Sequence, residues 1–260
     1  QVIKTEIPVS SPADPAGAKV PATPSAVSDE LLPAGTAGEV VRHTWYVLSY
    51  AEDHEQAEWV AYELTRDHLN ENWVARSNTF RPDPAVRTES ATPRDYNASG
   101  YDKGHLCPAA DMAFDEQAMD ETFLMSNMSP QVPAFNMGIW RELEECTRDW
   151  ARQFKRLYVV TGPVLAAPPL GQIGFSKVTV PGGYYKVLLA PGQRKAIAFM
   201  LPNAQSAQPV MDFACSIDKV EKTTGLDFFP RLLKGLDEEL EASLDKEAWP
   251  VDRKRYEERV

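Results

Sequence analysis

Two runs of aromatic and β-branched residues constrain the fold of this chain most. They are TWYVLSY (44–50) and AEWVAYEL (57–64), and the polar segment AEDHEQ (51–56) separates them. Such side chains favour strands, and a short polar connection between two strands is typical of an antiparallel hairpin. We therefore predict a β-hairpin over residues 44–64.

The later segments alternate between helix and strand signals. Helices are predicted for FDEQAMDETF (114–123), for GIWRELEECTRDWARQFKRL (138–157), from Ser216 onward, and as a solvated or frayed helix in the charged tail (237–260). Strands are predicted for RLYVVTGPVL (156–165), GGYYKVLLA (182–190) and KAIAFMLP (195–202), the last two as a second hairpin. Strands on both sides of a loop-and-helix region indicate the α+β class.

The first 36 residues differ in composition from the rest of the chain. They are rich in Pro, Ala, Ser and Gly, and such segments bury too little apolar surface to order themselves. We expect residues 1–36 to form a flexible tether and residues 37–260 to form a single domain. The chain begins with Gln1 rather than Met, which suggests either a removed leader or a trimmed sequence. We expect a secreted or periplasmic protein held by this tether, and the alternative is an N-terminal remnant without a role.

Charge and cysteine content limit the classes of function. The net charge of −11 argues mildly against a nucleic-acid binder, although a basic cleft can lie on an acidic protein. Cys107, Cys146 and Cys215 show no metal-ligand spacing, so a structural zinc site is not expected. No apolar run reaches the roughly 20 residues that a membrane-spanning helix needs.

The stretch YDKGHLCPAADM (101–112) carries the strongest chemical signal. It follows a long Pro-containing segment (76–104) that reads as an ordered functional loop. A neutral imidazole at His105 can take a proton from water if a carbonyl or carboxylate holds its other nitrogen, and Gly104 would let the backbone turn tightly beside it. The alternative is a structural histidine in a turn.

A second stretch, SNMSPQVPAFNMGIWRELE (126–144), contains Asn127, Asn136 and Glu144. An amide oxygen suits hydrated Mg²⁺, and a helix N-terminus favours phosphate. Eight residues of a regular helix rotate a side chain by roughly 80°, so Asn136 and Glu144 would share one broad side. Alone, each residue could instead be a turn residue, a helix cap or a solvated charge.

Together, these two stretches resemble the sugar-non-specific DNA/RNA endonucleases of the ββα-metal superfamily, which includes mitochondrial endonuclease G and secreted bacterial nucleases. The family signature is Asp-Arg-Gly-His, then Ser-Asn-x-x-Pro-Gln, then Asn-x-x-x-Trp-x-x-Leu-Glu. It is matched by Asp102 to His105, by Ser126 to Gln131, and by Asn136 through Trp140 to Glu144. The likeness extends over residues 44–235.

The resemblance implies a fold with a central, mostly antiparallel sheet flanked by helices, and it implies roles for the motif residues. His105 would be the general base, Asn136 the one direct protein ligand of a hydrated Mg²⁺, with Mn²⁺ or Ca²⁺ possible in its place. Asn127 would orient His105 or the waters of the ion, and Glu144 would hold such a water. Products would carry 5′-phosphates.

Basic residues would hold the substrate. Lys103 stands where the family has Arg, which keeps the charge but loses the bidentate fork. Of the upstream arginines flanking Asn78, Arg76 is favoured for a phosphate contact, while Arg81 could instead form a structural ion pair; Arg141 is a further phosphate contact. We expect sequence-independent binding of DNA and RNA, and a homodimer is possible.

Two alternatives stay open at this point. A degenerate nuclease fold could bind nucleic acid or a surface partner without cutting it, which the acidic net charge and Lys103 favour slightly. A narrower phosphodiesterase would place the same residues in a closed pocket that admits only small substrates.

Overall fold

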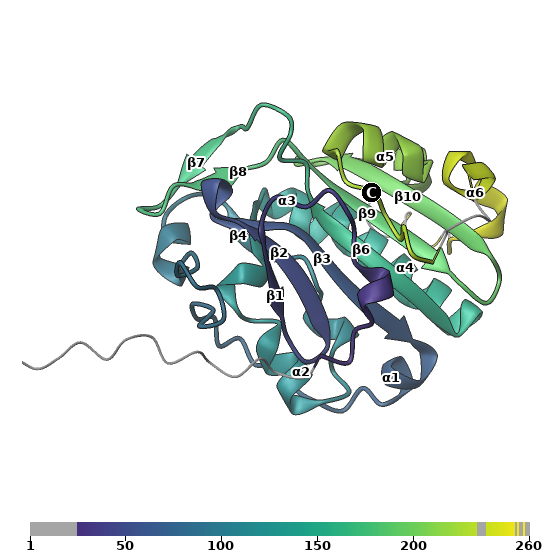
Figure 1. Ribbon diagram of the computed structural model, residues 1–260, viewed down its shortest axis with the longest axis horizontal. Coiled ribbons are helices and arrows are strands. Elements are labelled where there is room, and N and C mark those ends of the chain that lie inside the picture. Colours follow the sequence, from purple (N-terminus) through teal and green to yellow (C-terminus); the bar gives the residue numbers. More distant parts are fainter. Residues whose placement is uncertain (1–24, 233–237, 253, 255–256, 258–260) are drawn as a thin grey trace, which may run out of the picture.

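The computed structural model describes residues 25–232, 238–252, 254 and 257. Its main sheet has seven strands in the order β1-β2-β3-β6-β9-β10-β11, and every neighbouring pair is antiparallel (Figure 1). The strands are β1 (Glu39–Arg42), β2 (Tyr46–Ala51), β3 (Gln56–Thr65), β6 (Arg156–Pro163), β9 (Gly183–Ala190), β10 (Lys195–Pro202) and β11 (Ala214–Cys215). Both predicted hairpins are confirmed, as is the mostly antiparallel sheet.

Two short ribbons accompany the main sheet. One pairs β4 (Asp102–His105) with β5 (Met128–Gln131), and the other pairs β7 (Gly171–Ile173) with β8 (Val178–Val180). The second ribbon projects at the upper left of Figure 1. The β4–β5 ribbon was not predicted, because the sequence there reads as loop.

Six α-helices are described, and they confirm the α+β class. They are α1 (Arg66–Asn70), α2 (Glu116–Glu121), α3 (Pro133–Phe135), α4 (Arg141–Phe154), α5 (Ile217–Thr224) and α6 (Glu238–Ala242). The predicted start at Ser216 is correct, because the Ser216 hydroxyl caps α5 by accepting a hydrogen bond from the amide of Lys219. Within the described part of the chain, no helix has both the length and the apolar character that a membrane crossing requires.

The main sheet buries apolar side chains on both faces. In β9, Tyr184 and Leu188 belong to the cluster that contains Trp150 of α4, whereas Tyr185 belongs to the cluster that contains Ile217 of α5. Alternate residues of a strand point to opposite faces. Helix α4 therefore covers one face and α5 the other (Figure 1).

The ends of the predicted domain need two corrections. Residues 25–36 were assigned to the flexible tether, yet Val27 and Leu31 are buried in the cluster on the α5 face. The composition misled because a few apolar side chains suffice to hold a Pro-rich segment against a sheet. The rest of the predicted tether, 1–24, lies outside the described residues.

The charged tail is likewise more than a solvated helix. Trp249 is buried, and its ring lies edge-on to Trp150 and Phe154, with centroids 5.2 and 5.1 Å away. The indole nitrogen of Trp150 donates a hydrogen bond to the carbonyl of Pro250. One aromatic residue thus anchors this otherwise polar segment against α4.

Candidate active site

His105 is the last residue of β4, where it lies opposite Met128 of β5. It is therefore positioned by a strand rather than by a turn. Gly104 is also extended, and the expectation of a tight turn is wrong. Glycine is needed there because a Cβ atom would lie 2.2 Å from the side chain of Gln131, closer than packed atoms can approach.

The imidazole of His105 lies in an aromatic environment. The rings of Phe80 and Phe123 meet it edge-on, with centroids 5.8 and 5.0 Å away, and only 8% of the residue is exposed. This burial, followed by the positive charge of Arg76, lowers the pKa of His105 to about 3. The ring is therefore neutral at pH 7, and its burial makes it a weaker proton acceptor than a free imidazole.

The expected partner of the imidazole is not observed. Nε2 of His105 is buried and makes no hydrogen bond within the described residues. The sequence analysis required a carbonyl or carboxylate at the ring nitrogen that does not take the proton, and it did not say which nitrogen this would be. Aromatic packing against Phe80 and Phe123 orients the ring instead.

Two cations flank His105, each on an aromatic ring. The Lys103 ammonium lies 5.0 Å from the ring centroid of Phe80 and 5.9 Å from that of Tyr96. The Arg76 guanidinium carbon lies 5.0 Å from the ring centroid of Phe123. Cation–π contacts of this kind hold a charge in place while leaving other faces free for a phosphate. The site is locally basic despite the acidic net charge.

The other two arginines predicted to bind substrate are engaged in ion pairs. Arg81 forms a bidentate pair with Asp120, at 3.1 and 2.6 Å. The structure therefore shows the ion pair that was considered as the alternative for Arg81. Arg141 begins α4, is exposed, and pairs through Nε with Glu145 at 2.9 Å, one helical turn later.

Asn127 supports the segment that follows His105. Its Oδ1 accepts a hydrogen bond from the Cys107 amide at 2.8 Å, and its Nδ2 donates to the carbonyls of Cys107 and Thr122, both at 2.9 Å. Asn127 is fully buried. Its hydrogen bonds therefore run to the backbone, and none joins it to His105.

Asn136 reaches β4 from the helical side. Its Nδ2 donates to Oδ2 of Asp102 at 2.9 Å, which leaves Oδ1 free to meet a cation. Asn136 opens a π-helical turn (Asn136–Trp140) in which Gly138 has non-helical angles, φ −100° and ψ −111°. Such π-turns are frequent at functional sites. The expectation that Asn136 and Glu144 share one side of a regular helix is therefore wrong, because the helix is interrupted between them.

Glu144 lies on α4 and remains partly exposed. Surrounding protein atoms nevertheless desolvate its carboxyl group and raise its pKa to about 7, while the charges of Lys186 and Arg148 oppose this shift. Arg148 forms a 2.9 Å ion pair with buried Asp111. Within the described residues, the carboxylate of Glu144 accepts no hydrogen bond, so it is available to water.

The sequence analysis missed four residues of this region, namely Asp102, Asp111, Arg148 and Lys186. Asp102 could have been found, because it begins the motif that contains His105. Lys186 also carried a signal, since it is the one charged residue in the apolar run GGYYKVLLA. Asp111 and Arg148 become recognisable only when the fold brings them together.

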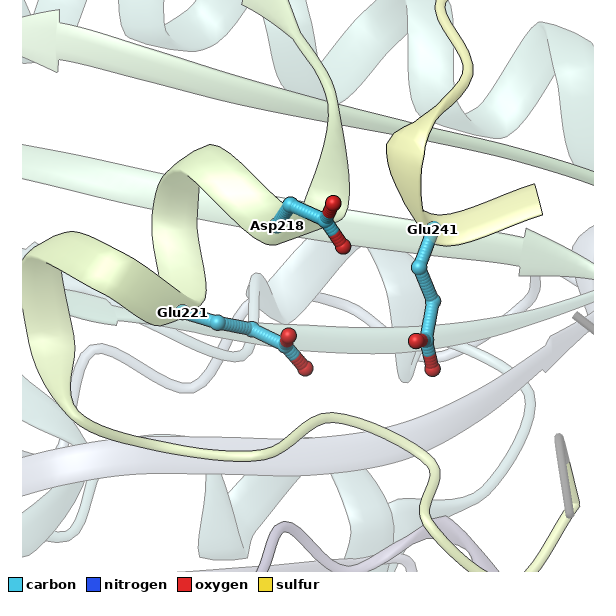
Figure 2. Close-up of side chains that lie close together, drawn as sticks. All are labelled: Asp218, Glu221 and Glu241. Atoms are coloured by element: carbon cyan, nitrogen blue, oxygen red, sulfur yellow. The ribbon is translucent and has the colours of Figure 1, made fainter. Parts of the chain in front are cut away.

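Oxygen atoms that could meet a cation lie in two parts of the molecule. In the described ranges, one group of three acidic side chains lies close enough to cage an ion, with ligand atoms within 4.8 Å of one another; it comprises Asp218, Glu221 and Glu241. Figure 2 shows these carboxylates converging from α5 and α6. Helix α5 covers the sheet face opposite α4. Near His105, an ion would instead meet the Asn136 oxygen and water, as Mg²⁺ prefers.

Comparisons with known proteins agree with this geometry. The model of the family described as DNA/RNA non-specific endonuclease matches residues 24–235. Nuclease C1 of Cunninghamella echinulata var. echinulata is 39% identical over 216 residues, covering 76% of this chain and 85% of that protein. Mitochondrial endonuclease G of Homo sapiens is 36% identical over 203 residues, covering 72% and 68%.

A solved structure is similar as well. It is a chain of the crystal structure of the EndoG/EndoGI complex, which matches with a TM-score of 0.69 and 32% identity. The match covers 74% of this chain and 86% of that chain. The likeness therefore extends over most of both molecules.

Proposed function

This chain belongs to the DNA/RNA non-specific endonuclease family and is thus a metal-dependent nuclease; from this premise we propose that it hydrolyses phosphodiester bonds of DNA and RNA with Mg²⁺ and leaves 5′-phosphate ends. The observation that carries the proposal is the hydrogen bond between Asn136 and Asp102. Asp102 and His105 are three residues apart in β4, a span of about 10 Å. The hydrogen bond therefore joins the helical segment that carries Asn136 to the strand that carries His105.

The chain's own residues would carry the proton and hold the substrate. Neutral His105 would take the proton from the attacking water once a phosphate lies beside the ring, because a nearby negative charge raises the low pKa of the buried imidazole. Lys103 and Arg76 would bind the phosphate from two sides. Contacts to phosphate carry no sequence information, so cleavage should be sequence-independent.

Asn136 would hold the cation through Oδ1, and Glu144 would accept hydrogen bonds from water in the ion's hydration shell. When bound, Mg²⁺ supplies positive charge that stabilises the phosphate and the departing oxygen. A site with one neutral protein ligand discriminates weakly among hard cations, so Mn²⁺ and Ca²⁺ should also bind there.

Plasmid nicking and RNA degradation by the purified protein test this proposal. We expect cleavage with Mg²⁺, none with EDTA, and a loss of about 100-fold or more in rate for His105→Ala. DNA binding by His105→Ala should stay near that of the wild type. His54→Ala is the matched control, because His54 contacts Thr179 and no residue of the site.

The possible results distinguish the proposed enzyme from its alternatives. Normal cleavage by His105→Ala would show that another group is the base. Tight binding by the wild-type protein without cleavage, across pH 6–9 and with either Mg²⁺ or Mn²⁺, would favour the alternative of a nucleic-acid-binding module. Cleavage of small phosphodiesters alone would favour the narrower enzyme.

We also infer a location outside the cytoplasm and a homodimer. The Pro-, Ala- and Ser-rich composition of residues 1–24 suits a tether, and the dimer rests on the family resemblance. Fractionation of producing cells tests the first, and recovery in the cytosol contradicts it. Light scattering tests the second, since a mass of 29.0 kDa would mean a monomer.

A further inference from the structure

Three exposed apolar side chains adjoin the candidate active site. Among the described residues, six large hydrophobic side chains are exposed, namely Val40, Trp73, Met137, Leu170, Phe175 and Leu244. Single exposed apolar residues are ordinary on a protein surface. Trp73, Met137 and Phe175 are different, because each is connected to a group that the proposed function uses.

Trp73 lies three residues before Arg76 in an irregular segment and is 64% exposed. Its backbone is fixed, because the amides of Trp73 and Val74 both donate to the carbonyl of Ala113, at 3.1 and 2.9 Å. Val74 also packs against the cluster that contains Phe123, the ring on which Arg76 lies. The exposed indole is therefore anchored beside the Arg76 end of the site.

Phe175 lies at the tip of the β7–β8 ribbon, which projects from the body of the molecule (Figure 1), and is 99% exposed. The amide and the hydroxyl of Ser176 donate to the two carboxylate oxygens of Asp95, at 2.9 and 3.1 Å. On the other side, Gly174 approaches Asp95 so closely that an added Cβ atom would lie 2.3 Å from it. Both neighbours of Phe175 are thus fixed, while its ring lies in solvent.

Tyr96 connects this tip to the site. Its ring shares an apolar cluster with Ile173 and Val178, the two residues that flank the tip. The centroid of the same ring lies 5.9 Å from the Lys103 ammonium. Lys177 adds a further exposed cation at the tip. The tip is therefore linked through one aromatic ring to a proposed phosphate contact.

Met137 directly follows Asn136, the proposed ligand of the cation, and is 66% exposed. The next apolar side chains of the same turn, Ile139 and Trp140, are buried. Because the Asn136 side chain is hydrogen-bonded to Asp102, Met137 lies at the cation side of the proposed site. A thioether side chain adapts readily to a flat apolar surface.

We propose that Trp73, Met137 and Phe175 form an apolar rim that binds unpaired nucleobases of the substrate strand, with Trp73 and Phe175 stacking on them. The inference rests on the proposed function and names its preferred substrate, which is single-stranded or locally opened DNA and RNA. A strand bound through its phosphate at Lys103 and Arg76 would bring its neighbouring bases to the rings that adjoin these cations. In a duplex, stacked base pairs cover the faces of the bases, so the rim would gain little there.

A nucleobase fits the apolar rim better than an apolar protein surface does. The rings of Trp73 and Phe175 come from separate segments and alternate with the cations Arg76, Lys103 and Lys177. Alternating rings and positive charges are typical of sites for single strands, and stacking there tolerates every base. The core of a protein interface is instead depleted of charge.

Oligonucleotide binding in EDTA tests the apolar rim without turnover. The ligands are a single-stranded DNA, the duplex of the same sequence, and an abasic strand of the same length. We expect Trp73→Ala and Phe175→Ala each to weaken single-strand binding by about 5- to 100-fold, as for one lost base–aromatic stack. Binding of the abasic strand and of the duplex should stay near that of the wild type, because the phosphate contacts remain.

Conservative variants separate stacking from folding. Trp73→Phe and Phe175→Tyr keep a ring and should retain most of the single-strand affinity, whereas Phe175→Leu keeps only apolar bulk and should lose it. Val40→Ala is the matched control. Val40 is exposed on β1, and because its neighbour Val41 packs in the cluster beneath α4, Val40 points to the opposite face. This variant should leave all three affinities unchanged.

The fluorescence of Trp73 gives a direct measurement. The other five tryptophans are buried or half-buried, so Trp73 is the one most accessible to acrylamide. Binding of the single strand should protect this fluorescence from quenching by acrylamide, and binding of the abasic strand should not. The protection should disappear in Trp73→Phe.

Equal losses of affinity for the single strand and for the abasic strand would overturn the inference, because the contact would then be with the backbone. Unchanged single-strand affinity in both alanine variants would also overturn it. If light scattering then shows that these variants no longer dimerise, the apolar rim belongs to a contact with a second copy of the chain. If the wild type binds the single strand but cuts nothing with any divalent cation, the proposed hydrolysis fails, while the same titrations still decide the role of the rim.

Discussion

The carboxamide of Asn136 donates a 2.9 Å hydrogen bond to the carboxylate of Asp102. The π-helical turn that begins at Asn136 is thereby fixed to the strand that ends at His105. This bond determines which way the free amide oxygen of Asn136 points. Residues that orient a ligand in this way typically contribute 10- to 100-fold to metal affinity, to order of magnitude.

The first prediction concerns Asp102. Asp102→Ala should raise the Mg²⁺ concentration for half-maximal cleavage by roughly 10- to 100-fold, because the Asn136 side chain loses its anchor. Calorimetric titration of the nucleic-acid-free protein with Mg²⁺ checks the same effect without turnover. Asp102→Asn keeps an acceptor and should stay close to the wild type. Equal Mg²⁺ dependence of Asp102→Ala and wild type would refute the anchoring role.

The second prediction separates Arg76 from Arg81. Arg76 is exposed beside His105, whereas Arg81 is paired with Asp120. Arg76→Met should reduce the slope of log affinity for DNA against log salt by about 1, as expected for one lost phosphate contact. Arg81→Met should leave the slope unchanged. Fluorescence anisotropy over a salt series measures both, and the opposite pattern would exchange their roles.

The third prediction concerns acid stability. The pKa of buried His105 is about 3 in the folded state, below about 6.5 in the unfolded chain. The unfolded chain therefore binds more protons, so this contribution to stability is complete above pH 6.5 and declines as the pH falls toward 3. Between pH 7 and 4, the wild type should lose on the order of 2–3 kcal/mol more unfolding free energy than His105→Gln.

Urea denaturation at pH 7, 5.5 and 4 measures this difference. The comparison with His105→Gln cancels the carboxylates that both proteins share. A gap between the two unfolding free energies that stays constant over this range would show that His105 titrates normally in the folded protein.

The fourth prediction concerns the buried pair of Asp83 and His43, whose Oδ2 and Nε2 atoms are 2.9 Å apart. Burial alone would raise the pKa of Asp83, but hydrogen bonds from His43 and from Ser126 lower it below its usual value. Asp83→Ala should lower the unfolding free energy at pH 7 by about 3–5 kcal/mol, because it breaks a buried charged network.

The sign of the pH dependence follows from the lowered pKa. The contribution of Asp83 is present above its unfolded pKa of about 3.9 and is lost as the pH falls through the lower folded value. The destabilisation by Asp83→Ala should therefore shrink below about pH 4. Ser126→Ala, which removes one donor, should cost only about 1 kcal/mol. Equal destabilisation at pH 3 and pH 7 would contradict this account.

Much of the sheet could be predicted from local pattern. The apolar run GGYYKVLLA and the polar connection at 51–56 are properties of neighbouring residues, and both hairpins formed as expected. Helix α5 was found for the same reason, since its cap lies one residue before its start. Local signals suffice where the partner is close in sequence.

The site was only partly predictable, because its contacts join distant segments. The motif around His105 was recognisable, but the edge-on ring of Phe80 lies 25 positions earlier, and Lys186 lies more than 40 positions after Glu144. Glycine is required at position 104 because of Gln131, which lies across the β4–β5 ribbon, and this ribbon was not predicted from the sequence. Such constraints arise only when the strands pair.

The break at Gly138 separates the turn that carries Asn136 from helix α4, which carries Glu144. The part with Asn136 rests through Phe135 on the ring of Tyr184, whereas α4 rests through Trp150 on the ring of Phe199. The ring of Trp140, the residue that leads into α4, also lies 5.4 Å from that of Phe135 and 5.5 Å from that of Tyr184, measured between ring centroids. A substitution at Tyr184 would therefore act both on the turn that carries Asn136 and on the start of the helix that carries Glu144.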